Sequence, residues 1–170
     1  MILSIDPGIK RTGWVVSDID TLRPLEKGIE EYPYEEDFRG FLESIHPITH
    51  VVIEKPVCQK WSGSDVSETA ILTGHIASAL RHCRVTLITR SKVKGVLAPR
   101  GNDSAIITAL HNKFTPGDPN LGKGTKKDPG WFYGFKGDIW QAYALGVVYA
   151  KMITRNSSAD RKYLNAGRLF

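Results

Sequence analysis

The order of strand-like and helix-like patterns is the feature of this sequence that most constrains its fold. In the first thirty residues, three short apolar segments are separated by turn residues, a pattern typical of antiparallel strands. Further along, β-branched runs alternate with segments whose apolar residues recur every three or four positions, which indicates helices. The predicted elements are strands over 1–5, 13–16 and 25–30, a helix around 38–45, a strand over 50–53, a helix over 65–80, a strand over 85–88, and helices over 93–97, 102–114 and from 138 onward. This order predicts an α/β fold with a mixed five-stranded sheet, three antiparallel strands being followed by parallel ones, and with helices on both faces.

Length and charge set the broad class of the protein. The chain has 170 residues, enough for one domain with a hydrophobic core but too few for two. We expect a single domain over residues 1–155 and a polar C-terminal tail over 156–170. A formal charge of +5 and a pI of about 9.2 favour a polyanionic partner, although they are weak evidence alone. The sequence contains no signal peptide and no apolar run long enough for a bilayer, so we expect a cytoplasmic protein without a membrane partner.

Three acidic residues stand where predicted strands end or a predicted helix begins. Asp6 follows the first strand, Glu54 follows the fourth, and Asp138 opens the last helix. If the two apolar strands lie side by side, Asp6 and Glu54 emerge at the same end of the sheet, and a helix N-terminus delivered there adds Asp138. Carboxylate oxygens are the ligands that hard divalent cations prefer. Two such cations can support phosphodiester hydrolysis, so the pattern indicates a Mg²⁺ site.

Each carboxylate also has a purely structural interpretation. Asp6 before Pro7 and Gly8 is a common arrangement in an Asx turn. Glu54 can pair with a neighbouring lysine, and Asp138 is well placed as a helix N-cap. The catalytic interpretation is stronger for the three residues together, because a single sheet geometry brings all of them to one place.

A set of motifs, in a fixed order along the chain, carries a resemblance to a known family. The motifs are ILSIDPG at 2–8, TGW at 12–14, VVIE at 51–54, VK at 93–94, GN at 101–102 and DIWQA at 138–142. In this order they resemble the motifs of RuvC-type Holliday junction resolvases, which have a ribonuclease H-like fold. The resemblance implies a structure-selective endonuclease that resolves four-way DNA junctions by paired, symmetric, metal-dependent nicks. It implies Mg²⁺ as the cofactor, with Mn²⁺ able to substitute and two ions in each active site.

The resemblance also implies a homodimer made through the helix over 65–80. This helix carries the small residues Gly74, Ala77, Ser78 and Ala79, which permit close approach of a second helix. The alternative is that they simply pack on the chain's own sheet. At its start, Asp65 and Glu68 have the spacing of a capping box, which predicts that Asp65 caps the helix.

The chain departs from the family pattern at three places. The last motif of the family has a second acidic residue three positions after the first, where this chain has Gln141. Residues three apart share a helix face, so the Gln141 amide oxygen is a candidate fourth ligand; the alternative is a hydrogen bond to the backbone at the helix start. A family lysine after the glycine-bearing loop is replaced by Ser104 and Ala105, and the Gly- and Lys-rich segment 115–137 is an unusually long loop.

Several basic and aromatic side chains are candidate DNA contacts. Trp61, in the loop after Glu54, can wedge between bases or stack on an unpaired one; the alternative is packing over the core edge. The basic candidates are concentrated in loops that lead toward Asp138. The predicted DNA-binding residues are Lys55, Lys60, Trp61, Lys92, Lys94, Arg100, Lys123, Lys126, Lys127 and Lys136.

Other functions share some of these motifs. A different ribonuclease H-like nuclease, acting on RNA or an RNA–DNA hybrid, would use the same carboxylates. A catalytically weak junction-binding module is a further alternative, because Gln141 carries no charge. Asp-Pro-Gly followed by Thr-Gly also resembles the phosphate loop of sugar-kinase ATPases, but these need a second domain for which the chain is too short.

Overall fold

The computed structural model describes residues 1–31, 48–57 and 63–166, with side chains as far as residue 154. The helix predicted around 38–45 lies outside the described residues. The elements are β1 (Ile2–Asp6), β2 (Arg11–Ser17), β3 (Pro24–Glu31), β4 (His50–Lys55), α2 (Ser64–Ala79), β5 (Arg84–Thr89), α3 (Arg90–Leu97), α4 (Asp103–Phe114) and α5 (Ile139–Ala166). Their order confirms the alternation predicted for the described part of the chain.

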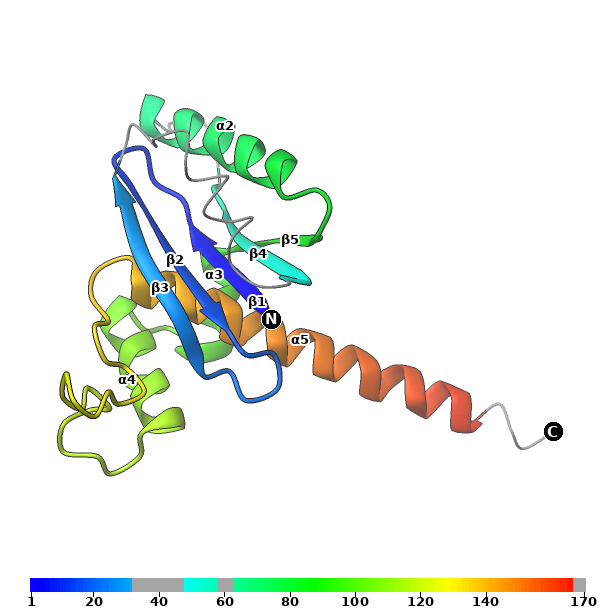
Figure 1. Cartoon of the computed structure of the whole chain (residues 1–170). Helices are drawn as coiled ribbons and strands as arrows, with labels where there is room; N and C mark the ends of the chain where they lie inside the picture. The colour runs from blue at the N-terminus through cyan, green and yellow to red at the C-terminus, as the bar shows by residue number, and fades with distance from the viewer. Residues whose placement is uncertain (32–47, 58–62, 167–170) are drawn as a thin grey trace.

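The five strands form one mixed sheet in the order β3-β2-β1-β4-β5 (Figure 1). β1 pairs antiparallel with β2, and β2 pairs antiparallel with β3. β4 lies parallel to β1 and β5 parallel to β4. The predicted mixed sheet is therefore confirmed, and the two apolar strands that precede Asp6 and Glu54 are neighbours at its centre.

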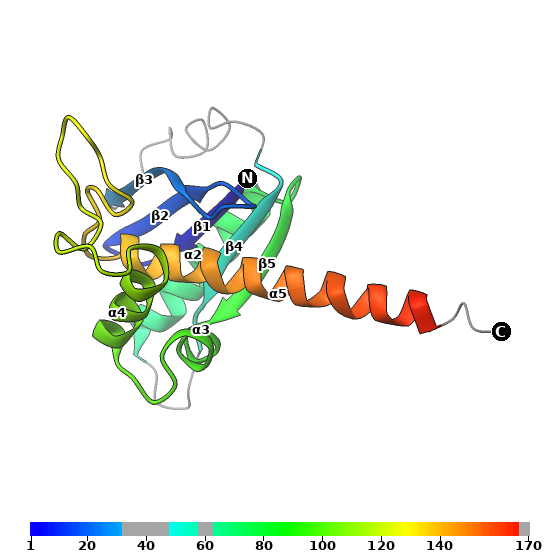
Figure 2. The same ribbon diagram turned by 90° about the horizontal axis from the view of Figure 1, so that it is seen from below.

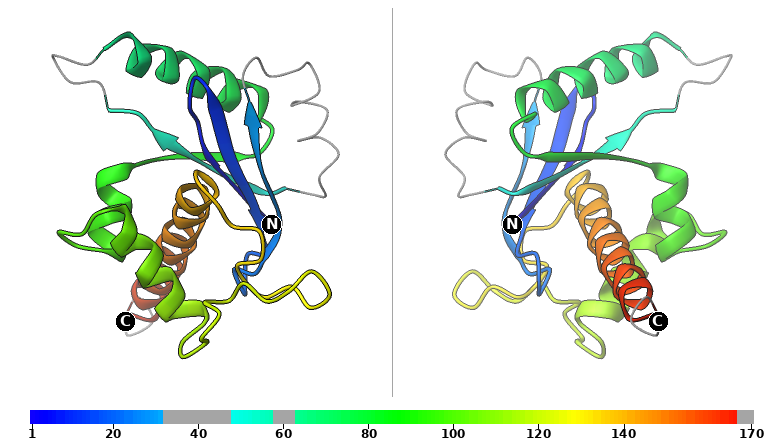
Figure 3. Two further views of the ribbon diagram at one scale, coloured as in Figure 1. Left: turned by 90° about the vertical axis from the view of Figure 1, so that its left-hand side faces the viewer. Right: turned by 90° about the vertical axis from the view of Figure 1, so that its right-hand side faces the viewer.

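Helices cover both faces of the sheet, as predicted. Successive residues of a strand point to opposite faces, and in β1 this divides Ile2 from Leu3 and Ile5. Ile2 belongs to a buried cluster shared with α3, α4 and α5, whereas Leu3 and Ile5 pack with Ile76 and Leu80 of α2 and its C-terminal end. Figure 3 shows the sheet lying between α2 on one side and α5 on the other.

The first turns of α5 press closely against the sheet because two positions have little or no side chain. Gly146 lies over Ser4, whose hydroxyl donates a hydrogen bond to the Val15 carbonyl at 3.1 Å. A Cβ on Gly13 would come within 2.6 Å of the Asp138 backbone, so only glycine admits the start of α5 at this point. Further along, α5 projects beyond the sheet (Figure 2). The segment predicted as a polar tail from residue 156 continues as helix as far as Ala166.

Two of the predicted helix starts have different outcomes. Asn102 caps α4 as predicted, and its side chain accepts a hydrogen bond from the Ala105 N–H at 3.0 Å. The prediction of a capping box at the start of α2 is wrong, because the N-cap residue is Gly63 and no side chain caps the helix. α2 begins early enough to include Asp65 in its first turn, where the carboxylate still faces the positive end of the helix dipole. None of the described helices is both long and apolar enough to cross a membrane.

The long segment 115–137 is a loop, as predicted, and aromatic packing holds its base in place. The Trp131 indole donates a hydrogen bond to the Tyr143 hydroxyl, which in turn donates to the Leu22 carbonyl, both at 2.9 Å. Phe132 is fully buried, and Phe135 contacts it edge-on. Within the segment, a bridge between Gly124 and Pro129 closes a short hairpin, here called the lysine hairpin (residues 123–130).

Candidate active site

Asp6 and Glu54 lie side by side at the carboxyl end of the two central strands. The register pairs Ile5 with Ile53, so the next residues, Asp6 and Glu54, lie next to each other at the ends of their strands. Both point to the face that α5 covers, because each is an even number of residues from Ile2 or Val52, which pack on that side. The backbone turns away directly after Asp6, where a Cβ on Gly8 would come within 2.6 Å of the Arg11 carbonyl oxygen. The sheet geometry expected from the sequence is thus confirmed for these two carboxylates.

Asp138 joins them at the start of α5. The close approach at Gly13 holds this helix start beside Asp6, because Gly13 is the β2 partner of Asp6. One carboxylate oxygen of Asp138 lies 2.6 Å from Nε of Arg11, which belongs to β2. The backbone carbonyl of Asp138 accepts the first helical hydrogen bonds of α5. The Thr-Gly motif therefore has a physical role in the site, since its glycine admits the third carboxylate.

Two of the three carboxylates, Asp6 and Glu54, are costly to ionise. The pKa of Asp6 is raised to about 8, first by burial and then by the negative charge of Glu54, with a smaller contribution from Asp138. Burial also raises the pKa of Glu54, although the positive charge of Arg90 opposes this. Carboxylates that are this costly to ionise are typical of functional sites, because a bound cation or proton must compensate them.

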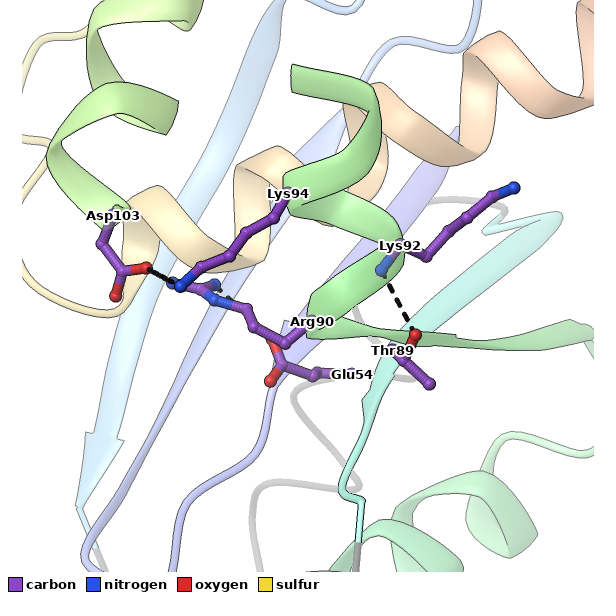
Figure 4. Close-up of polar contacts among 6 residues, drawn as sticks. All are labelled: Glu54, Thr89, Arg90, Lys92, Lys94 and Asp103. Atoms are coloured by element: carbon purple, nitrogen blue, oxygen red, sulfur yellow. Dashed lines mark hydrogen bonds and ion pairs between the residues drawn. The ribbon is translucent and has the colours of Figure 1, made fainter. Parts of the chain in front are cut away.

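A second group of charged residues borders Glu54 (Figure 4). Arg90 is the first residue of α3, and its guanidinium lies 3.6 Å from Glu54 Oε2 and 2.8 Å from Asp103 Oδ1. Lys94, one turn further along α3, reaches the same Asp103 oxygen at 3.5 Å. These contacts connect the ends of β4 and β5 with the starts of α3 and α4. Asp103 is thus a fourth acidic residue near the site, and its charge raises the pKa of both Asp6 and Glu54.

The oxygens at this end of the sheet suit a hard divalent cation. Among the described residues, Glu54 Oε2 and Gln141 Oε1 are buried and accept no well-aligned hydrogen bond, whereas Asp138 Oδ2 is paired with Arg11. Buried oxygens without partners are costly, and a cation can satisfy them. No three Asp, Glu, His or Cys side chains of the described chain already converge as a complete ligand set. The donor types fit Mg²⁺ or Mn²⁺, and the buried Gln141 Oε1 is one turn of α5 after Asp138.

An open pocket of about 440 Å³ is lined by two of these carboxylates, Asp6 and Asp138. Its lining residues are Asp6, Pro7, Gly8, Ile9, Lys10, Arg11, Asp65, Thr69 and Asp138. Its lining therefore combines three acidic side chains with two basic ones. The pocket lies between the β1–β2 turn and α2, which leaves one side of the carboxylates accessible.

The predicted DNA-binding residues are spread over different parts of the molecule. Lys94 lies beside the carboxylates, whereas Lys92 lines a separate pocket with Lys151 on the α3–α5 surface. Three further candidates are exposed: Lys55 at the end of β4, Arg100 after α3 and Lys136 before α5. Lys60 and Trp61 lie outside the described residues.

The lysine hairpin does not border the active-site pocket. It carries Lys123, Lys126 and Lys127, all exposed, and its base is anchored through Trp131 and Tyr143 to Leu22 in the β2–β3 turn. That turn lies at the end of the sheet opposite Asp6, because Ile2 pairs with Ser17 whereas Asp6 pairs with Gly13. The loop leads toward Asp138 along the chain, but its lysines project elsewhere.

Three charged residues of the site did not follow from the motifs. Arg11 and Arg90 lie outside the matched motifs, and Asp103 has the pattern of a helix start. Arg90 had a usable signal, since it follows the last residue of β5 just as Glu54 lies at the end of β4. Residues at the carboxyl ends of neighbouring parallel strands meet at one edge of a sheet, so the strand order alone brings Arg90 close to Glu54.

Comparisons with known proteins give matches among solved structures alone. No protein-family model matches the sequence, and no curated protein is significantly similar to it. The fold is similar to that of Thermus thermophilus RuvC in complex with a Holliday junction substrate, with 19% identity, a TM-score of 0.58 and coverage of 89% of this chain and 94% of that one. T. thermophilus RuvC in another structure has 19% identity, a TM-score of 0.54 and coverage of 89% and 95%. A fowlpox virus resolvase in complex with Holliday junction DNA has 14% identity, a TM-score of 0.51 and coverage of 89% and 99%.

These structural matches and the order of the motifs agree with each other. The mixed sheet, the helices on both faces and the placement of the carboxylates at one end were predicted from the order of the elements, and the motif resemblance covers nearly the whole chain. The structural matches extend over 89% of it. The chain therefore has the ribonuclease H-like fold of the RuvC-type resolvases.

Proposed function

We propose that this protein is a metal-dependent endonuclease that cleaves four-way DNA junctions. The observation that carries the proposal is the meeting of Asp6, Glu54 and Asp138 at one end of a RuvC-like sheet. The structures with a similar fold include two that hold Holliday junction DNA. The basic net charge of +5 is compatible with a nucleic-acid substrate.

Asp6, Glu54, Asp138 and Gln141 are the proposed metal ligands. They would hold two Mg²⁺ ions, with Mn²⁺ able to substitute, and such ions activate a water molecule and stabilise the leaving oxygen of the phosphodiester. Because Gln141 is neutral, this set brings three negative charges to the ions. These four ligands would therefore leave more positive charge on the ions for the DNA phosphate to neutralise than a set of four carboxylates would.

The residues around the pocket have separate roles in this proposal. Lys10 and Arg11 stand at the pocket rim, where their charges attract the scissile phosphate toward the carboxylates. Arg11 also orients Asp138 through their 2.6 Å contact. Burial of Asp6 keeps bulk water from solvating its charge, which strengthens its interaction with a cation.

A comparison of substrates tests the proposed function directly. The protein is incubated with Mg²⁺ and a four-way junction, a linear duplex of the same sequence, or an RNA–DNA hybrid. We expect the junction to be cut at least about tenfold faster than the others, a discrimination that about 1.4 kcal/mol of differential transition-state binding provides. Preferential cutting of the hybrid would favour an RNA-processing nuclease. Junction binding without cutting in any metal would favour the binding module instead.

We further propose that two copies pair through the exposed face of α2. Thr73 and Ile76 of this helix face the sheet, whereas Ile71 is 60% exposed. A Cβ on Gly74 would meet nothing within 4 Å, so this small residue is not needed for packing within the chain. Ile71 also lines a partly apolar pocket with Ile9 of the β1–β2 turn. A two-fold symmetric dimer would present two equivalent sites for paired nicks.

Substitution of Ile71 by glutamate should separate the dimer. A charge placed in an apolar contact must be desolvated without a partner, which costs several times the thermal energy. Light scattering at micromolar concentration should give twice the chain mass for the parent protein and the chain mass for Ile71→Glu. Leu25→Glu, at a similarly exposed position on β3, is the matched control and should remain dimeric. A monomeric parent protein, with and without junction DNA, would contradict the dimer.

The lysine hairpin is proposed to contact a DNA arm outside the active site. Each phosphate contact releases counterions and adds about 0.9 to the slope of log affinity against log salt. Replacing Lys123, Lys126 and Lys127 together by glutamine should therefore lower the magnitude of this slope by up to about 2.7 for the four-way junction. Fluorescence anisotropy over a salt series measures it, with Lys113→Gln on α4 as the control. An unchanged slope in the triple variant would place the hairpin away from the DNA.

A further inference from the structure

Arg90 is the basic residue that lies beside Glu54, one of the proposed metal ligands. Its side chain is only 24% exposed, and that of Glu54 is 20% exposed, so water screens their interaction weakly. An arginine next to a carboxylate can form two parallel hydrogen bonds with it. A fully closed pair of this kind would occupy the Glu54 oxygens and leave them poorly available to a cation.

The structure shows that this pair is not closed. The distance from Arg90 Nη1 to Glu54 Oε2 is 3.6 Å, beyond the range of a hydrogen bond. Arg90 Nη2 instead contacts Asp103 Oδ1 at 2.8 Å. Glu54 Oε2 consequently accepts no well-aligned hydrogen bond among the described residues, although the nearby Arg90 still opposes the rise in the pKa of Glu54. In Figure 4 the guanidinium lies between the two carboxylates, with its short contact directed to Asp103.

Asp103 is itself fixed from two sides. It is the first residue of α4, whose N-cap Asn102 orders the helix start. Lys94 contacts the same oxygen as Arg90, at 3.5 Å. Burial would raise the pKa of Asp103, but its hydrogen bonds and charge interactions with Arg90 and Lys94 lower it, which keeps it ionised at neutral pH. A permanently charged anchor for Arg90 is therefore built into the start of α4.

We propose that Asp103 is a positioning residue that holds Arg90 away from Glu54 and so keeps Glu54 available to a divalent cation. The inference rests on the metal site of the proposed function, but it does not depend on the nucleic-acid substrate. Without Asp103, the guanidinium is released and closes on Glu54, the nearest remaining carboxylate. Arg90 then competes with the cation for the same oxygens. Asp103 thereby sets the metal affinity of the site without being a ligand.

A double-mutant cycle on Mn²⁺ binding, measured by calorimetry without DNA, tests this role. Asp103→Asn should weaken Mn²⁺ binding by about tenfold, and Asp103→Glu should restore most of it. Arg90→Gln should bind Mn²⁺ at least as tightly as the parent protein, because the competing cation is gone. In the Arg90→Gln background, Asp103→Asn should change Mn²⁺ affinity by less than about twofold. Double-mutant cycles isolate such a coupling between two side chains.

The controls separate this mechanism from the simpler explanations. Arg84→Gln removes the same charge at the opposite end of β5 and should leave Mn²⁺ affinity unchanged. If Asp103 acted only through its own negative charge, Asp103→Asn would weaken binding equally with and without Arg90, which would overturn the proposal. Weaker Mn²⁺ binding by Arg90→Gln would also overturn it, since Arg90 would then support Glu54 directly.

The outcome is also distinguishable from failure of the proposed function. A parent protein that binds Mn²⁺ and shows the expected cycle, yet cuts no junction, would refute the endonuclease and leave the role of Asp103 intact. A parent protein that binds no Mn²⁺, or binds it equally well as Asp6→Asn, would overturn both. Thermal melting of every variant identifies changes in affinity that come from unfolding.

Discussion

Asp6→Asn and Glu54→Gln should each reduce junction cleavage by about a thousandfold or more, while junction affinity stays within a few-fold of the parent value. The reason is that these carboxylates are proposed to hold the ions that activate water and stabilise the leaving group, a contribution of several kcal/mol. Both side chains are largely buried, so they are not expected to provide most of the contacts with the DNA backbone. Single-turnover cleavage and anisotropy on the same junction measure the two quantities.

Asp20→Asn is the matched control for this prediction. Asp20 is exposed in the β2–β3 turn, at the opposite end of the sheet, and its loss should leave the cleavage rate unchanged. Parent cleavage rates in either Asp6→Asn or Glu54→Gln would remove that residue from the site. A large fall in junction affinity would mean instead that the carboxylates support the binding surface.

The second large effect should appear in the pH dependence of stability in EDTA. The pKa of Asp6 is raised from 3.8 to about 8 by burial and by the neighbouring charge of Glu54. Between these pH values the folded protein retains a proton that the unfolded chain has released. The free energy of unfolding therefore falls as pH rises, at up to about 1.4 kcal/mol per pH unit, and this loss ends above the folded pKa.

Asp6→Asn should remove most of this pH dependence. Between pH 5 and pH 8 the stability of the variant relative to the parent protein should increase by about 3 to 4 kcal/mol. Saturating Mg²⁺ should narrow the difference, because a cation that binds ionised Asp6 stabilises the parent protein selectively. Urea unfolding at both pH values, with EDTA or Mg²⁺, measures the effect. If the free energies of unfolding of the variant and the parent protein changed in parallel with pH, the pKa of Asp6 would not be raised in the folded protein.

Together these two experiments describe a common compromise. A residue that is costly to bury and yet required for cleavage stabilises the protein when it is replaced and inactivates it at the same time. Asp20→Asn should do neither. If Asp6→Asn lowered stability at pH 8, the carboxylate would have a structural partner, such as the Asx turn considered from the sequence.

The sequence alone was sufficient for the features that depend on local pattern and strand order. The apolar runs 2–5 and 50–53 are followed directly by Asp6 and Glu54, so their pairing as parallel neighbours was enough to bring both carboxylates to one edge. Gly13 in the Thr-Gly motif was recognised, although its reason, the close approach of Asp138, appears only in three dimensions. The cap at Asn102 was also local, because an N-cap contacts a backbone N–H three residues ahead.

Only the tertiary structure decided the contacts between elements that are distant in the sequence. Arg11 reaches Asp138 across 127 residues of chain, and the approach of Arg90 to both Glu54 and Asp103 depends on how α3 and α4 pack. The position of the lysine hairpin could not be predicted from its sequence either, because it is set by hydrogen bonds that link Trp131 through Tyr143 to Leu22. Periodicity and capping patterns record interactions within a few residues, whereas the direction of a long charged side chain is set by whichever opposite charge the packed fold brings within reach.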